Sequence, residues 1–172
     1  MPRQDNRDKS NRKKDAMKGL YFEEMEPGKV IKHLLTRTIT EMDNVMFTSL
    51  TMNVAPIHLD VEYAKTLPYG KPLVNSLFTM GLIGGMTVPD LVFQTSLGNL
   101  GYEEVKFPNP VFAGDTLRAE TTILDKRLSK SDPTRGIVWF EHRGINQRDE
   151  IVFQCKRAGM AMCRPADETQ DA

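Results

Sequence analysis

One segment of the chain brings together residue types that could move a proton. It reads TMNVAPIHLD, residues 51–60, with His58 five residues after Asn53 and Pro56 between them. An imidazole can accept and return a proton near neutral pH, because its unperturbed pKa is about 6.5. The amide of Asn53 can orient a water or a substrate by hydrogen bonds, but it does not usefully take up or release a proton. The segment therefore predicts His58 as a general acid/base and Asn53 as a group that positions its reactant.

Helical patterns lie on both sides of this segment. Thr40 and Asp43 match a capping box, with Asp in place of the usual Glu, and predict a helix over residues 41–50. Residues 51–58 are expected to be irregular, because Asn and Pro disfavour a helix interior. Residues 60–67 predict a short helix that a proline and a glycine then stop.

A longer apolar stretch follows. LVNSLFTMGLIGGMTV, residues 73–88, is apolar almost all round and predicts a buried helix that Pro89 ends. Gly81, Gly84 and Gly85 each cost stability in a helix. We therefore expect another part of the structure to approach this helix very closely at the glycines.

The second half of the chain is rich in β-branched and aromatic residues separated by turn formers. Together with an earlier run, five segments predict strands: residues 29–39, 96–107, 115–129, 135–147 and 150–163. This order predicts an α+β fold, an antiparallel sheet wrapped round the buried helix, and the long strands favour a dimer that continues or covers a sheet edge. Trp139 is expected in the core, and His33 and His142 at the surface or in structural roles.

Composition limits the classes of protein to consider. The 172 residues, 40% of them hydrophobic, fit one domain with an ordinary core. Net charge is zero, but residues 1–18 hold seven Lys or Arg and three Asp. This basic tail has too few large apolar residues to fold and is expected to be disordered, and residues 166–172 are expected to be flexible. Because the rest of the chain is acidic, binding to nucleic acid or to a membrane is disfavoured.

The cysteines and the N-terminus favour the cytoplasm. The N-terminus lacks the apolar core of a signal peptide, and residues 73–88 are too short and too rich in glycine to span a bilayer. On one strand, Cys155 and Cys163 would lie about 26 Å apart and could not form a disulfide. Neither the cysteines nor the three scattered histidines have the spacing of a zinc site, so no metal is expected.

Three blocks of sequence together resemble one enzyme family. They are RTITEMDNVMFTSLTMNVAPIHLDVEYAK, KPLVNSLFT (71–79) and VKFPNPVFAGDTLRAE (105–120). In this order they are similar to the MaoC-like dehydratases, the R-specific enoyl-CoA hydratase branch of the hot-dog fold. The resemblance runs from about Gly19 to Arg164, and four residues match the motif of the first block: Thr51, Pro56, His58 and Ala64. Asn53 departs from it, because the family has an aspartate there.

The resemblance implies roles for several residues and a manner of assembly. The family's His-Gly pair is Asn75-Ser76 here, at a helix N-terminus where the backbone N–H of Ser76 would donate to the thioester oxygen. Asn75 and Thr51 are the further residues expected to bind substrate. The family also implies a homodimer or higher oligomer with the acyl-CoA in a tunnel at the subunit interface. CoA enters as part of the substrate, and no metal or redox cofactor is required.

Three functions are compatible with an amide at the aspartate position. The first is reversible hydration or dehydration of a short enoyl-CoA, branched or carboxylated as in mesaconyl-CoA, with His58 making both proton transfers. The amide would then avoid repulsion of the substrate carboxylate, and Arg37, Lys71 or Arg118 could supply a cation. The alternatives are acyl-CoA hydrolysis and binding of an acyl-CoA without turnover.

Overall fold

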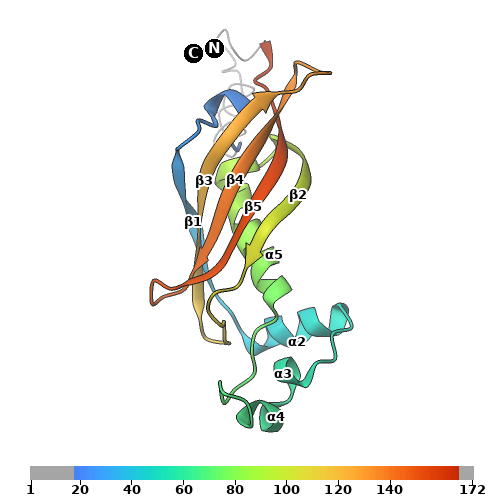
Figure 1. Ribbon diagram of the computed structural model, residues 1–172, viewed down its shortest axis with the longest axis vertical. Coiled ribbons are helices and arrows are strands. Elements are labelled where there is room, and N and C mark those ends of the chain that lie inside the picture. The colour runs from blue at the N-terminus through green and yellow to red at the C-terminus, as the bar shows by residue number, and fades with distance from the viewer. Residues whose placement is uncertain (1–17, 167–172) are drawn as a thin grey trace, which may run out of the picture.

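The computed structural model describes residues 18–166, so the predicted tail over residues 1–18 and the predicted flexible C-terminus over residues 166–172 lie, apart from their boundary residues, outside the described residues. Five antiparallel strands form one sheet in the order β1-β3-β4-β5-β2 (Figure 1). In chain order the strands are β1 (Val30–Thr38), β2 (Ser96–Lys106), β3 (Thr116–Leu128), β4 (Arg135–Ile145) and β5 (Ile151–Met162). All five strand predictions are confirmed to within two residues at each end.

The helices form a layer on one face of the sheet and a separate group at one end (Figure 1). They are η1 (Phe22–Glu24), α2 (Glu41–Leu50), α3 (Pro56–Leu59), α4 (Val61–Lys65), α5 (Ser76–Thr87) and the π-helical turn η2 (Val88–Val92). The long helix α5 packs mainly against β1, β3 and β4. This arrangement confirms the α+β hot-dog prediction of an antiparallel sheet around a long helix.

Two apolar clusters fill the space between α5 and the sheet. One joins α5 to β3 and β5 and includes Ile83, Met86, Leu117 and Phe153. The other, near η2, includes Leu91, Ile123, Val138 and Phe140. Burial alternates along β3 and β4, because successive strand residues point to opposite faces.

The same alternation corrects the prediction for Trp139. Val138 and Phe140 are buried in the core, whereas Trp139 points to the other face and is half-buried beside Arg127, whose guanidinium lies 5.8 Å from its ring. The unbroken apolar run had indicated burial on both faces.

The long helix differs from its prediction in extent and in burial. Helical structure continues through Pro89 into η2, because proline is tolerated in the first turn of a helical segment. Only one face of α5 is covered, since Leu77, Gly81 and Gly85 are exposed. The prediction of a helix buried all round is therefore wrong for this chain by itself.

The close approach to α5 occurs at a different glycine from those predicted. A Cβ built at Gly81, Gly84 or Gly85 would meet no described atom within 4 Å. At Gly144, in β4, a Cβ would lie 2.6 Å from Cγ1 of Ile83. Gly144 therefore lets the sheet approach the helix, while the helix glycines face open space in the described chain.

His33 and His142 are buried and structural. Nδ1 of His33 donates to Asp90 at 2.5 Å, and the Thr121 hydroxyl bridges Nε2 of His33 (2.6 Å) and Nδ1 of His142 (2.8 Å). Burial lowers the pKa of His142 to about 3, with the nearby positive charge of Arg157 acting in the same direction. This chain of bonds connects η2 to β1, β3 and β4 across the core.

No helix among residues 18–166 is long and apolar enough to cross a membrane.

Candidate active site

His58 lies on α3, a single helical turn within the segment predicted to be irregular. Pro56 begins the turn, where its missing N–H costs nothing. Nδ1 of His58 lies 2.9 Å from the carbonyl oxygen of Leu73. Because a carbonyl can only accept, Nδ1 must carry the proton, and in the neutral ring Nε2 is then the basic nitrogen. The fold therefore presents a histidine whose tautomer is set for accepting a proton at Nε2.

Asn44, which the sequence prediction missed, connects the parts of this site. From α2, its side-chain NH2 donates to the carbonyls of His58 (2.9 Å) and Leu73 (3.1 Å). Its Oδ1 accepts from the backbone N–H of Asn75 at 2.9 Å. Asn44 is 5% exposed, so these bonds are made away from water, where losing them is costly. The one sequence signal for this residue is an Asn in a helix interior, where its propensity is low.

The N-terminus of α5 supplies backbone donors beside His58. Asn75 is the N-cap residue, and its Oδ1 accepts from the N–H of Leu77 at 2.9 Å. Ser76 is the first residue of the helix, and its N–H has no hydrogen-bond partner within residues 18–166. The helix dipole places partial positive charge at this end, so the Ser76 N–H is available to an oxygen that gains negative charge.

Asn53 and Thr51 lie at the end of α2 and in the loop after it. Oδ1 of Asn53 accepts from the N–H of Ala55 at 3.1 Å, which leaves the side-chain NH2 without a partner in the described chain. Thr51 donates its hydroxyl to the Phe47 carbonyl at 2.8 Å and caps α2. Neither residue lines the two cavities at His58. Thr51 serves the helix end in this structure, and Asn53 offers a hydrogen-bond donor.

His58 lines two cavities. The larger, of about 260 Å³, is also lined by Ser76, Thr79, Tyr69 and the residues 107–111 loop, and it brings His58 and Ser76 together. The smaller, of about 160 Å³, lies between α2 and the loops that carry Lys71 and Phe112. Asn75 is buried at the N-terminus of α5, where its side chain caps the helix.

The described residues include both cysteines and side chains of the types that can bind a metal ion. Within residues 18–166, no three His, Cys, Asp or Glu side chains gather into a group that could hold a metal ion. Cys155 and Cys163 are both unpaired, as predicted. Burial raises the pKa of the Cys155 thiol to about 11, so this thiol is poorly suited to nucleophilic chemistry.

Comparison with known proteins identifies similar enzymes. The chain is 33% identical to a mesaconyl-CoA hydratase of Cereibacter sphaeroides over 139 residues, which are 81% of this chain and 40% of that protein. It is 34% identical to a beta-methylmalyl-CoA dehydratase of Chloroflexus aurantiacus over 155 residues, which are 88% of this chain and 44% of that protein. The chain thus spans less than half the length of these curated relatives.

A solved structure and a family model cover the same region. The crystal structure titled monoamine oxidase regulatory protein, from Archaeoglobus fulgius, superposes with a TM-score of 0.77 at 30% identity and covers 87% of this chain and 99% of its own. The model of the MaoC like domain matches residues 22–139. That span contains α2 to α5 and His58, the histidine that lines both cavities. The chain belongs to the MaoC-like domain family.

Proposed function

We propose that the protein catalyses the reversible hydration of a short enoyl-CoA thioester, branched or carboxylated, with His58 as the acid/base. The observation that carries this proposal is the pairing of His58 with Ser76 in the larger cavity. One residue offers a basic nitrogen and the other a free backbone N–H at a helix N-terminus. Addition of water to an α,β-unsaturated thioester requires these two groups.

The reaction follows from their positions. Nε2 of His58 takes a proton from water as the water oxygen bonds to the β-carbon. The electrons of the double bond move toward the thioester oxygen, and the Ser76 N–H donates to that oxygen as its negative charge grows. His58 then returns the proton to the α-carbon. The net change is addition of one water, and the reverse sequence is dehydration.

Asn53 acts in this scheme as a donor. Its oxygen is already used by the Ala55 N–H, so its NH2 is the group that can hold the water or the substrate. Asn75 supports the donor by capping α5, and Thr51 supports the segment by capping α2. Both are therefore proposed to position substrate-binding groups, and only Ser76 to touch the thioester.

The substrate class is proposed from similarity as well as from charge. The two relatives are named for mesaconyl-CoA and beta-methylmalyl-CoA, both carboxylated thioesters. An aspartate at position 53 would repel a substrate carboxylate, at a cost of about 4 kcal/mol for charges 4 Å apart at an effective dielectric constant of 20. An amide removes this cost, so Asn53 fits a carboxylated acyl group.

We further propose that the protein works as a homodimer or higher oligomer. Residues of β2 are exposed along the whole strand, and α5 packs mainly on the other strands. The side chains of Leu97, Leu100 and Tyr102 of β2 are exposed, and the glycines of α5 face open space, so both elements offer surface that a second copy would cover. Coverage of this kind also accounts for the glycines, since small residues allow close packing of helices.

The remaining proposals concern boundaries, cofactors and location. We propose a MaoC-like domain over residues 19–165, with CoA carried by the substrate and no metal or redox cofactor. Two unpaired cysteines favour action in the cytoplasm. Neither nucleic acid nor a membrane is proposed as a partner.

Loss of enoyl-thioester absorbance tests the function. With mesaconyl-CoA and crotonyl-CoA in parallel, we expect turnover of the carboxylated substrate, reduced at least about 100-fold in His58→Gln. Glu62→Gln, at an exposed position of α4, is the matched control and should keep full activity. Free thiol is measured in the same samples. Release of CoA would favour hydrolysis, and activity unchanged in His58→Gln would remove His58 from the mechanism.

A further inference from the structure

A carboxylated acyl group needs a cation near His58. In a thioester such as mesaconyl-CoA, the second carboxylate is attached close to the carbon that water attacks. The group must therefore lie beside the imidazole that activates the water. The sequence offers three candidates for this cation, Arg37, Lys71 and Arg118.

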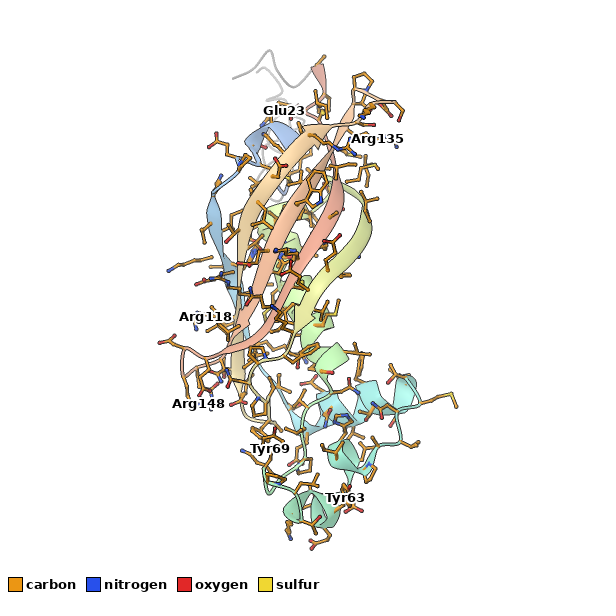
Figure 2. The ribbon with its side chains drawn as sticks, viewed as in Figure 1. Glu23, Tyr63, Tyr69, Arg118, Arg135 and Arg148 are labelled. Carbon is orange, nitrogen blue, oxygen red and sulfur yellow. The ribbon has the colours of Figure 1, made fainter. Side chains whose placement is uncertain are left out.

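Two of these cations are already neutralised. Arg37 pairs with Asp43, the residue that closes the capping box of α2. Arg118 donates to the Asn146 carbonyl at 3.1 Å and to the Asp149 carboxylate at 2.9 Å. Figure 2 shows Arg118 at the lower part of the sheet on its β1 and β3 side, while Tyr69, two residues before Lys71, lies in the helical end.

Lys71 differs from both. Within residues 18–166 it has no hydrogen bond and no ion pair, and its Nζ lies 4.1 Å from the centre of the Phe112 ring. An aromatic face steadies an ammonium group without cancelling its charge. The ring is itself held by Tyr69, in an edge contact at 6.0 Å.

The backbone around Lys71 is tied to the catalytic histidine. Two residues later, the carbonyl of Leu73 accepts from His58, and the N–H of Leu73 donates to the carbonyl of Ile57 at 3.0 Å. Lys71 and His58 line the same smaller cavity, together with Phe112. Glu41 is the one carboxylate among the residues lining it, and no ion pair in the described chain joins Glu41 to Lys71.

We propose that Lys71 is the specificity residue that receives the carboxylate of the acyl group in the smaller cavity. The inference rests on the proposed function, since it assigns the substrate class of the same site. An amide at position 53 removes an anion, and an unpaired ammonium at position 71 supplies a cation. Together they make the surroundings of His58 favourable for a dicarboxylic thioester and less so for an uncharged one.

Kinetic comparison of two substrates tests this assignment. Lys71→Gln should lower kcat/KM for mesaconyl-CoA about 10- to 100-fold, the usual range for loss of a charged hydrogen-bond partner, and change that for crotonyl-CoA less than about 3-fold. Lys71→Arg should keep most of the mesaconyl-CoA activity. Lys65→Gln, which removes an exposed lysine of α4, is the matched control. Equal losses with both substrates would mean that Lys71 serves the CoA phosphates or the fold, and would overturn the proposal, as would no loss.

A binding measurement separates failure of this inference from failure of the proposed function. Titration calorimetry compares methylsuccinyl-CoA with butyryl-CoA, neither of which has a double bond to hydrate. The full chain should prefer the carboxylated ligand, and Lys71→Gln should abolish that preference. This result with no turnover of any enoyl-CoA would sink the hydratase function and keep the assignment of Lys71. Equal binding of both ligands by the unaltered protein would refute the assignment.

Discussion

At the scale of single residues, we propose that Asn53 sets which acyl groups the site can process. Its oxygen is bonded to the Ala55 N–H, and its NH2 is free. In Asn53→Asp, one carboxylate oxygen could keep this bond and the other would supply a base where the amide is proposed to hold the water. We expect crotonyl-CoA hydration to rise by about 10²-fold or more, because general acid/base participation contributes about 10²–10⁴-fold. Hydration of mesaconyl-CoA should fall, because two carboxylates would then face each other.

The ratio of kcat/KM for crotonyl-CoA to kcat/KM for mesaconyl-CoA measures this change in substrate preference. Asn53→Ser, which removes both the donor and the charge, is the control. If Asn53→Asp raised or lowered both activities alike, charge repulsion would not be the reason for an amide at this position.

At the same scale, sequence reasoning reached some site residues and missed others. His58, Asn53 and Ser76 were predicted because their chemistry is visible in the residue type and in the resemblance of whole blocks, and their roles stay predictions. Asn44 was missed, since its three bonds join α2 to residues 14 and 29–31 positions away, and no local pattern encodes such contacts. Lys71 could not be separated from Arg37 and Arg118 until their ion pairs were known.

At the scale of elements, the chain of bonds from Asp90 to His142 couples β1, β3 and β4 to η2 and makes stability depend on pH. The pKa of His142 falls from 6.5 to about 3 on folding because the ring is buried. The unfolded chain therefore binds more protons between these values, and stability decreases as pH falls through this window. We expect the free energy of unfolding to drop by about 2 kcal/mol from pH 7 to pH 5 through this group.

Urea unfolding of the protein and of His142→Gln at the two pH values measures this contribution. The glutamine does not titrate, so its pH dependence should be smaller by that amount, although the variant is less stable at pH 7. Hydrogen bonds from Thr40 and Gln147 lower the pKa values of Asp43 and Asp115. The stability that these two carboxylates contribute is lost at lower pH in both proteins. Identical pH dependence in the two proteins would show that folding does not shift the pKa of His142.

Local patterns predicted the elements well and their burial poorly. The capping box at Thr40 and Asp43 determined where α2 begins, because it satisfies the first N–H groups of the helix by itself. Turn formers likewise marked the strand ends. Burial depends on what covers each face, so Trp139 was assigned to the wrong face. A separate error concerns Pro89, which was expected to end a helix that continues through it.

At the scale of the whole molecule, the glycines of α5 indicate a surface that the chain leaves uncovered. Gly81, Gly84 and Gly85 were expected to face a close neighbour, and none of the described residues provides one. A glycine in an exposed helix costs about 0.8–1.0 kcal/mol relative to alanine. Three such residues in one helix are unfavourable for an isolated chain but suit an interface in which a second copy packs against the backbone.

Gly85→Leu tests whether a second copy packs on this face of α5, because the substitution should stabilise an isolated chain but disrupt a dimer. In an isolated chain the substitution would stabilise α5 by most of about 1 kcal/mol, because leucine is a good helix former and a Cβ at this position meets nothing within 4 Å. In a dimer packed on this face, the added side chain would force the subunits apart. We expect sedimentation velocity to show a dimer for the unaltered protein and dissociation toward monomer in Gly85→Leu, with lower enoyl-CoA turnover. Lys65→Leu, which adds the same side chain on α4, should leave the dimer intact. A Gly85→Leu protein that stayed dimeric and melted at a higher temperature would place the interface elsewhere, because only an uncovered helix face gains stability from the change.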